Sequence, residues 1–213
     1  AGEIGMVQML PYDILKNGAD GDGDGIVSLT TSAADALSSA GKMLQSLGWQ
    51  AGEPWLAEVT VPRDFDWSET GLETTKPICD WVALGVEPRN GPLAEGLQGS
   101  VLIPQGRNGP AFIAYPNFRV YFEWNQSFTY VMTAAYFATR LQGAQVFDAG
   151  TPDIGLDGIQ MRHLQTGLQD MGYDVGGVDG ILGSGTRAAV RAEQRRLGMP
   201  VDGWPTPELL SKL

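Results

Sequence analysis

Apolar residues recur at helical spacing in four stretches of this chain. The first predicted helix begins after Ser32, which has the spacing of a capping box with Asp35, and ends at Gly48. Its apolar stripe consists of Leu37, Ala40, Leu44 and Leu47. Further helices are predicted over residues 127–141, 159–171 and 186–197, with Gly143, Gly172 and Gly198 as their stops. A short last helix is expected to begin with Thr206 as its cap and Pro207 in its first turn.

The region between the first two helices lacks this period and is rich in Pro, Gly and Trp. Extended pieces alternate there with turn residues, which predicts a small sheet or hairpin unit on a helical body; they are residues 58–61, 100–104 and 111–115. Residues 145–156 show no periodicity and are predicted to be a linker. We therefore expect a mainly α (α+β) protein with two domains, over residues 1–144 and 157–213.

Composition excludes several classes of protein. The 213 residues carry a net charge of −11, which disfavours a nucleic-acid partner because no basic surface is available for phosphates. No apolar stretch approaches the roughly 18 residues of a membrane span, so no transmembrane segment is expected. The single cysteine, Cys79, excludes an internal disulfide. The chain starts at Ala1 without Met or a signal sequence, which indicates a processed or truncated polypeptide.

An acidic loop with the sequence DGDGDGI carries the most specific local chemistry. Carboxylates at alternate positions, with a Gly for a sharp turn, wrap oxygens around a hard cation, and Ca²⁺ suits such flexible coordination better than Mg²⁺. The predicted ligands are Asp20, Asp22, Asp24, the Ile26 carbonyl and Asp35. Asp35 is included because Thr31 stands where an EF-hand loop has its closing Glu. The alternative is a solvated Asp-Gly turn without metal, with Asp35 only a helix-cap partner.

The C-terminal residues resemble a known wall-binding module. The spaced string includes LQ at 164, MGY at 171, VDGILG at 178, TRAAV at 186 and VDG at 201. It resembles the peptidoglycan-binding domain, a three-helix module of cell-wall enzymes, and the match covers about residues 159–213. Glu193 departs from the family, which usually has an aromatic residue there, so that position is less buried here or the ligand groove differs.

That resemblance implies a shallow murein-binding groove near Tyr173, Asp179 and Thr186. The residues themselves support another interpretation for the two Asp-Gly pairs, namely turns in which Asp bonds neighbouring backbone and Gly supplies a positive φ. His163, the only histidine, is expected to be a surface or capping residue.

The N-terminal residues GEIGMVQMLP resemble the Gly-x-x-Gly-x-x-Gln signature of lytic transglycosylases. The acidic loop and the later motifs GEPW, GPAF, YPNFR and WNQSFTY match the membrane-bound lytic murein transglycosylase B family to about Gly143. This resemblance implies a lysozyme-like helical domain, incomplete at its N-terminus, that cleaves peptidoglycan glycan strands. Some members of that family carry a calcium-binding EF-hand-like loop, so structural Ca²⁺ and no organic cofactor are expected.

The resemblance also implies that the family's catalytic Glu lies upstream of this chain, on a missing segment or a second chain. Glu3 is an improbable replacement because it lies inside the Gly-rich motif. The complete enzyme would cleave the MurNAc-β-1,4-GlcNAc bond without water. One acid would protonate the leaving oxygen and then deprotonate the C6 hydroxyl, which gives 1,6-anhydro-MurNAc ends.

Five residues are candidates for contact with the glycan strand. Gln8 is predicted to form a hydrogen-bonding wall of the cleft, or else to satisfy backbone as a buried residue. Asn125 could bond an N-acetyl group or the catalytic carboxyl. The rings that could stack on sugars, or equally belong to the core, are Tyr115, Trp124 and Tyr130.

A non-catalytic murein-binding protein that has lost the acid is the alternative function. Both functions place the protein in the periplasm, where peptidoglycan lies, and an upstream segment could anchor it to the membrane. An unpaired cysteine is tolerable there if it is buried. An open cleft floor would leave an apolar patch, so the lone chain is expected to self-associate.

Overall fold

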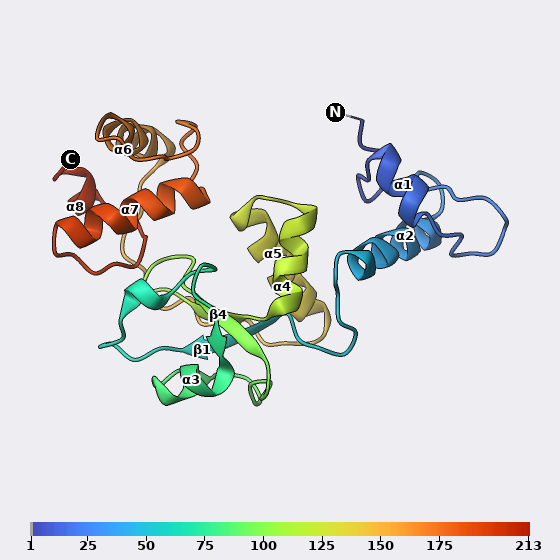
Figure 1. The fold of residues 1–213 in the computed structure, drawn as a ribbon, viewed down its shortest axis with the longest axis horizontal. Helices are drawn as coiled ribbons and strands as arrows, with labels where there is room; N and C mark the ends of the chain where they lie inside the picture. Colours follow the sequence, from blue (N-terminus) through green and yellow to red (C-terminus); the bar gives the residue numbers. More distant parts are fainter. Residues whose placement is uncertain (1) are drawn as a thin grey trace. The chain divides into compact units, whose positions relative to one another are not determined.

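The computed structural model describes residues 2–213 (Figure 1). Its packing defines two compact units, which are treated separately below. Unit 1 comprises the residues up to Glu53 together with Val120–Trp124, and unit 2 comprises Pro54–Arg119 together with Asn125–Leu213. These units differ from the domain borders expected above, which stay a prediction.

Unit 1 contains helices α1 (Pro11–Asn17) and α2 (Ala33–Ser46), which pack against each other. As predicted, Ser32 caps α2: its hydroxyl oxygen accepts the Asp35 N–H at 3.2 Å. The end of helix α4 (Pro116–Trp124) also belongs to this unit, and Tyr121 there meets the edge of the Trp49 ring at 5.4 Å.

The predicted apolar stripe of α2 is partly wrong. The buried residues on this helix are Asp35, Ala36, Ser39 and Ala40, whereas Leu37 is exposed. The acidic loop causes the difference, because it approaches α2 so closely that a Cβ on Gly21 would lie 2.4 Å from the Ala34 carbonyl oxygen. The loop therefore covers a polar and small-residue face of the helix.

The centre of unit 2 is a five-stranded antiparallel sheet with the order β2-β4-β5-β1-β3. Its strands are β1 (Leu56–Thr60), β2 (Lys76–Pro77), β3 (Glu87–Pro88), β4 (Gln98–Leu102) and β5 (Ala111–Ala114). In the register of the central pairs, Phe112 of β5 lies opposite both Glu58 and Leu102. The predicted small sheet is thus confirmed, and β2 and β3 are additions that the sequence did not indicate.

An aromatic and aliphatic core fills one side of this sheet. Trp81 on α3 (Ile78–Ala83) is fully buried in it, and its indole N–H donates to the Gly99 carbonyl at 2.8 Å. A short 3-10 helix, η1 (Trp67–Glu69), adds a ring at the margin of this core. Sequence periodicity missed α1, α3 and η1 because each is too short to display two helical turns of apolar pattern.

Helix α5 (Phe128–Leu141) has the predicted bounds, is capped by Ser127 and contacts β1 (Figure 1). The last three predicted helices also form: α6 (Gly158–Asp170), α7 (Ser184–Arg196) and α8 (Pro207–Leu210). They lie together around their own core of fully buried Leu164, Leu168 and Leu209. We call residues 157–213 the C-terminal module.

The predicted linker has no helix or strand, yet hydrogen bonds hold it to its surroundings. The Asp148 N–H donates to Glu58 at 2.8 Å, and the Thr151 N–H donates to the Asn108 carbonyl at 2.8 Å. The module itself reaches the sheet region through α7, because Arg191 donates to the Thr70 hydroxyl at 3.2 Å. Unit 2 therefore includes the sheet, α5, the linker and the module.

Candidate functional site

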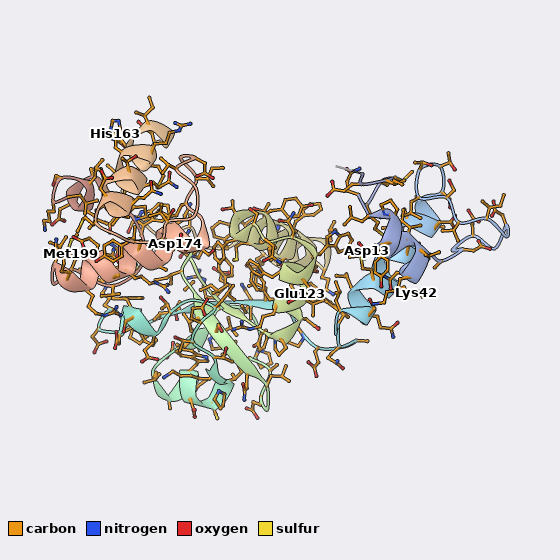
Figure 2. The ribbon with its side chains drawn as sticks, turned by 45° about the horizontal axis from the view of Figure 1, so that its top comes forward. Asp13, Lys42, Glu123, His163, Asp174 and Met199 are labelled. Carbon is orange, nitrogen blue, oxygen red and sulfur yellow. The ribbon has the colours of Figure 1, made fainter. Side chains whose placement is uncertain are left out.

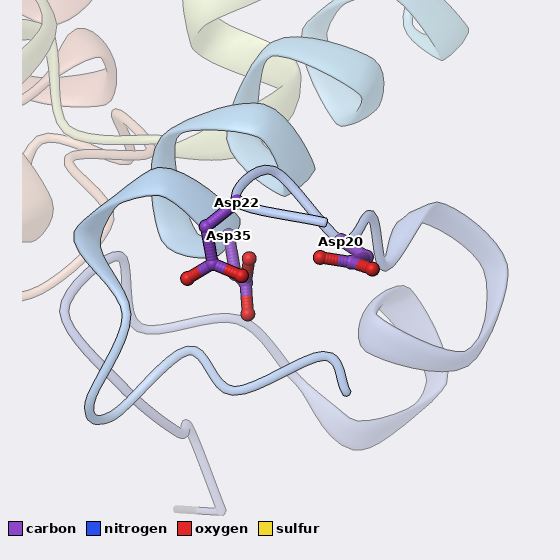
Figure 3. Close-up of side chains that lie close together, drawn as sticks. All are labelled: Asp20, Asp22 and Asp35. Atoms are coloured by element: carbon purple, nitrogen blue, oxygen red, sulfur yellow. The ribbon is translucent and has the colours of Figure 1, made fainter. Parts of the chain in front are cut away.

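The acidic loop of unit 1 brings three carboxylates together (Figure 3). Oxygens of Asp20, Asp22 and Asp35 lie within 4.8 Å of one another, and these residues form a group that could hold a metal ion within the described chain. All-oxygen donors of this kind suit a hard divalent cation. The donor set therefore fits the calcium expected from the sequence.

Asp35 organises this loop from the first turn of α2. It is buried, and its two oxygens accept the backbone N–H groups of Gly21 at 2.7 Å and Ser28 at 2.8 Å. These bonds, first that from Ser28 and then that from Gly21, hold the pKa of the Asp35 carboxyl below its usual value. The carboxylate is thus ionised and positioned at neutral pH.

One predicted carboxylate ligand, Asp24, lies outside this group. It accepts the Ile26 N–H at 2.8 Å, which closes an Asx turn at the exposed tip of the loop, and the Ile26 carbonyl stays a predicted ligand. Within the group, Asp20 accepts the N–H groups of Gly23 and Gly25 at 2.6 and 2.8 Å. The loop backbone is therefore held by carboxylates even without a cation, which is the alternative role considered above.

The N-terminal motif forms a tight turn in unit 1. Ile4 and Met9 pair in an antiparallel bridge, and Gly5 at φ +77° lies against Leu29, whose carbonyl oxygen would be 2.5 Å from a Cβ at position 5. Gln8 has φ +49°, the one left-handed residue other than glycine in residues 2–213. Its side-chain amide donates to the Gly5 carbonyl at 2.8 Å. The strained backbone, of a kind that costs about 1–3 kcal/mol, holds this exposed amide at the turn.

Tyr115 and Tyr130 have opposite environments in unit 2. Tyr115 is buried in the sheet core, where its hydroxyl accepts the Ala94 N–H at 3.1 Å and burial raises its pKa. Its ring thus offers no surface for stacking on a sugar, and it fills the core role that was the alternative for these aromatics. Tyr130 on α5 is 60% exposed and is available for contact.

Trp124 and Asn125 adjoin in sequence and are both partly exposed. The Asn125 side-chain oxygen accepts the Ser127 N–H at 2.9 Å and so shapes the entry to α5. This bond uses the amide oxygen and leaves the side-chain NH₂ as the donor for a ligand. Their predicted contacts with sugar stay predictions.

The three predicted groove residues of the module have structural hydrogen bonds. Thr186 is fully buried and donates to the Val175 carbonyl at 3.0 Å, so it belongs to the frame rather than to an exposed groove. Asp179 is exposed and accepts the Ile181 N–H, the main reason that the pKa of its carboxyl is lowered. The Tyr173 hydroxyl donates to Glu193 at 3.2 Å.

Two buried glutamines hold the Asp-Gly turns by hydrogen bonds. The sequence motifs did not predict this role. Gln165 on α6 donates to Asp179 at 3.2 Å and accepts the Gly180 N–H at 2.9 Å. Gln194 on α7 repeats this arrangement, with bonds of 2.8 Å to Asp202 and 2.9 Å from Gly203. The turn interpretation of both Asp-Gly pairs is confirmed. The signal available in the sequence was a helical Gln followed by an Asp-Gly pair, which occurs twice.

Glu193 is fully buried, so the first of the two alternatives for this position, lower burial, is wrong, and a different ligand groove stays a prediction. Its carboxylate accepts the Arg196 Nε–H at 2.9 Å, and this bond holds the pKa of Glu193 below its usual value. An ion pair with Arg196 therefore stands at the position where the resemblance implies an aromatic residue. His163 lies on the exposed face of α6 (Figure 2), as expected.

The fold combines a helical region and a small antiparallel sheet with a C-terminal helical module. Residues 1–139 match the Transglycosylase SLT domain family, and residues 157–213 match a peptidoglycan binding domain family. The chain belongs to the SLT transglycosylase family, whose lysozyme-like fold is mostly helical with a small antiparallel sheet. Among curated proteins, no significant match is found.

Solved structures extend this likeness over both parts. SltB3 from Pseudomonas aeruginosa, solved in complex with NAG-anhNAM-pentapeptide, is 39% identical with a TM-score of 0.85, covering 99% of this chain and 58% of that protein. Slt35 from Escherichia coli, solved with calcium, is 25% identical with a TM-score of 0.52, covering 65% of this chain and 45% of that protein. SltB1 from P. aeruginosa is 25% identical with a TM-score of 0.52, covering 64% and 45%. The chain thus spans under three fifths of these relatives.

Proposed function

We propose that this chain is part of a peptidoglycan lytic transglycosylase that forms 1,6-anhydro-MurNAc ends at the MurNAc-β-1,4-GlcNAc bond. The similarity to SltB3 carries this proposal, because it extends over 99% of the chain at a TM-score of 0.85. The test adds the chain together with a family-related N-terminal half to purified sacculi and analyses the released muropeptides by mass spectrometry. Products lighter by one water than hydrolysis products support the proposal, whereas reducing ends alone would contradict it.

The proposed catalytic acid lies outside these 213 residues. A general acid needs a raised pKa in a partly apolar site. Glu3 is exposed, whereas the shielded side chains of Glu58 and Glu193 are each paired with an arginine, at 3.0 and 2.5 Å. For Glu193 this pairing lowers the pKa, the opposite of what an acid catalyst requires. None of these three glutamates therefore offers the environment of a general acid.

Unit 1 has an apolar surface suited to a further helical segment bearing the acid. Tyr12, Leu15 and Leu37 are 72, 86 and 70% exposed on α1 and α2. Large apolar side chains that are exposed on neighbouring helices favour an interface with a further segment. The segment belongs to the same polypeptide or to a second chain. Adding a family-related N-terminal half to the chain should restore anhydro-muropeptide release and reduce self-association.

Gln8 is proposed to position the substrate or the acid in the assembled enzyme. Its side chain is exposed next to a rigid turn, which gives a donor and acceptor fixed in space. Gln8→Ala in the assembled enzyme is expected to lower kcat while sacculus binding through the module is retained. The control Gln50→Ala alters an exposed glutamine of the same unit. Equal activity of Gln8→Ala and Gln50→Ala would contradict the proposed role of Gln8.

The acidic loop is proposed to bind a structural Ca²⁺. Its support is the group formed by Asp20, Asp22 and Asp35, together with the calcium complex of Slt35. Calcium titrated into chelator-treated protein should release or absorb heat and raise the Tm. Asp22→Asn should weaken this binding, whereas Asp64→Asn, at an exposed acid of unit 2, should leave it unchanged. Absence of heat and of any Tm shift in the unaltered chain would contradict a metal site.

A non-catalytic murein-binding role is the second candidate, and the paired state of the shielded glutamates favours it. The two functions separate in one experiment, in which the chain is mixed with sacculi with and without the N-terminal half. Retention without release in both mixtures supports a binding protein.

We also propose an extracytoplasmic location, because the polymer that the family acts on lies outside the cytoplasmic membrane. Among the described residues, no helix has the length and apolar character needed to cross a membrane. Cys79 is exposed, so the condition that it be buried is not met. Its exposed thiol should therefore react in whole cells with a thiol reagent that does not cross the cytoplasmic membrane, and no reaction would contradict this location.

A further inference from the structure

A cavity of about 650 Å³ lies within unit 2, where the C-terminal module meets α5 and the sheet. This volume is in the range of small-ligand sites, about 300–1,000 Å³. Its lining comes from both family-matched regions and from the segment between them, so neither region forms it alone. The residues that matter below are Phe112, Phe128, Tyr136, Phe147, Arg187 and Trp204.

One wall of the cavity is a rigid cluster of rings. Phe147 meets Tyr136 edge to face at 4.9 Å between ring centroids, and Phe112 lies 5.9 Å from Phe147. The Tyr136 hydroxyl accepts the Phe147 N–H at 3.2 Å. Edge-to-face rings of this kind form stable apolar surfaces. This wall therefore favours the apolar part of a ligand.

Among the described residues that line the cavity, Arg187 on α7 is the one with a charged side chain. Its guanidinium carbon lies 5.1 Å from the centroid of the Phe128 ring and 5.9 Å from that of Trp204, and one terminal nitrogen donates to the Pro104 carbonyl at 2.8 Å. Its Nε atom is buried and has no hydrogen-bond partner in the described chain. Burial lowers the pKa to about 10, so the group stays positively charged at neutral pH.

No carboxylate of residues 2–213 forms an ion pair with Arg187. Asp202 influences its charge, but the Asp202 carboxylate is engaged by Gln194 at 2.8 Å and by the Trp204 N–H at 3.0 Å. A buried guanidinium without an anionic partner is costly in a folded protein. The cavity thus holds a cation that lacks its anion.

The chemistry of the lining defines the ligand. A single guanidinium recognises one carboxylate, with two parallel N–H···O bonds available in the favourable geometry. A doubly charged phosphate would need more donors than this apolar cavity offers. Thr129 and Thr133 of α5 add hydroxyl groups to the lining. These features fit a short chain of small apolar residues that ends in a carboxylate.

We propose that the Arg187 cavity binds the C-terminal carboxylate and last alanines of a peptidoglycan stem peptide. This inference rests on the proposed function, because that function supplies the peptide. Arg187 holds the carboxylate, and the ring wall contacts the alanine methyl groups. The cavity would then let the chain distinguish glycan strands that still carry long stem peptides from strands that do not.

The test is calorimetric titration of the full chain with diacetyl-Lys-D-Ala-D-Ala, as the free acid and as the C-terminal amide. The acid is expected to bind at least about tenfold more tightly than the amide, because the amide lacks the charge that Arg187 requires. Equal binding of the two peptides, or no binding of the acid, overturns the proposal. Tighter binding of decanoate at the same site overturns it in favour of a lipid carboxylate.

Two variants test the cavity itself. Arg187→Met should reduce binding of the acid about tenfold, whereas Arg195→Met, at an exposed arginine of the same helix, should not. Thr133→Trp fills the cavity from the exposed side of α5 and should abolish binding while Arg187 is intact. Thermal melting establishes that each variant is folded. Undiminished binding by a folded Thr133→Trp variant overturns the location.

A second assay separates this inference from the proposed function. Retention of the chain is compared on intact sacculi and on glycan strands from which an amidase has removed the stem peptides. Preferential retention on intact sacculi is expected. Equal retention on both overturns the inference and leaves a glycan-binding function, whereas retention on neither contradicts murein binding by the chain.

Discussion

Unit 1 and the C-terminal module are stabilised by different kinds of interaction. The module encloses fully buried Leu164, Leu168 and Leu209, which pack against one another in its own core. Unit 1 instead presents Leu15 and Tyr12 to the exterior and orders its long loop through carboxylates that bond backbone N–H groups. Burial of apolar surface stabilises the module without a ligand, whereas a cation bound by the acidic loop would add to the stability of unit 1.

The largest difference between the two regions should appear when leucines are truncated. Leu164→Ala removes a fully buried side chain from the module core and should cost about 2–5 kcal/mol of unfolding free energy. Leu37→Ala removes an exposed side chain from unit 1 and should change stability by less than about 0.5 kcal/mol. Urea denaturation of the full chain, followed by circular dichroism, measures both. Similar costs would show that Leu37 is covered in solution.

Removal of divalent cations should affect unit 1 and leave the module unchanged. If the loop binds Ca²⁺, free calcium at 100 times its Kd stabilises unit 1 by about 2.7 kcal/mol. Hydrogen exchange by mass spectrometry resolves the two regions in one experiment. Chelator should speed exchange in residues 18–46 but not in α6 or α7. Equal acceleration in both regions would contradict the contrast drawn here.

The close packing of α7 against the sheet region is expected to stabilise unit 2 in addition to its apolar cores. Gly71 has φ +108°, and a Cβ there would lie 2.5 Å from an Arg191 terminal nitrogen. Gly71→Ala should therefore cost about 1–2 kcal/mol. Gly167→Ala in the middle of α6 meets no close neighbour and should stabilise by up to about 1 kcal/mol. Equal Tm values for the two variants would contradict the tight junction.

Acid should produce the smallest effect, and it should appear in both regions, because the pKa of Asp35 in unit 1 is lowered as well. The pKa values of Asp179 and Glu193 are lowered, by the Ile181 N–H and by Arg196 respectively. Their contribution is fully present above the unfolded values near pH 4 and is lost as pH falls through the lower folded values. Denaturant midpoints between pH 6 and 2 measure this loss. Glu193→Gln should weaken the dependence of the denaturant midpoint on pH. An unchanged dependence would show that the ion pair of Glu193 does not cause the loss of stability.

Local sequence signals predicted the helices well because their causes lie within a few residues. The Ser127 and Thr206 caps and the turns at Gly143, Gly172 and Gly198 all occur as expected. Short helices such as α1 and α3 were not predicted because one or two turns show too little apolar periodicity. The stripe on α2 failed because a loop, rather than an apolar partner, covers part of that helix.

Side-chain roles were harder to predict than elements. The grouping of Asp20 and Asp22 was readable because these ligands are close in sequence, and Asp35 was found from its helix-cap position. Tyr115 and Thr186 are buried because distant segments pack over them, which no local pattern reports. The two glutamine anchors also depend on contacts between residues 8–15 positions apart.

By itself, the sequence determined the family resemblance, the helices with their caps, and the acidic loop, since each follows from residues that are near one another in the chain. Only the tertiary structure decided that Glu193 is buried and that Arg187 lines a cavity without an ion pair to any carboxylate of residues 2–213. The physical reason is that burial and pairing depend on which distant segments meet. Arg187 and Pro104, for example, are joined across 83 positions of the chain.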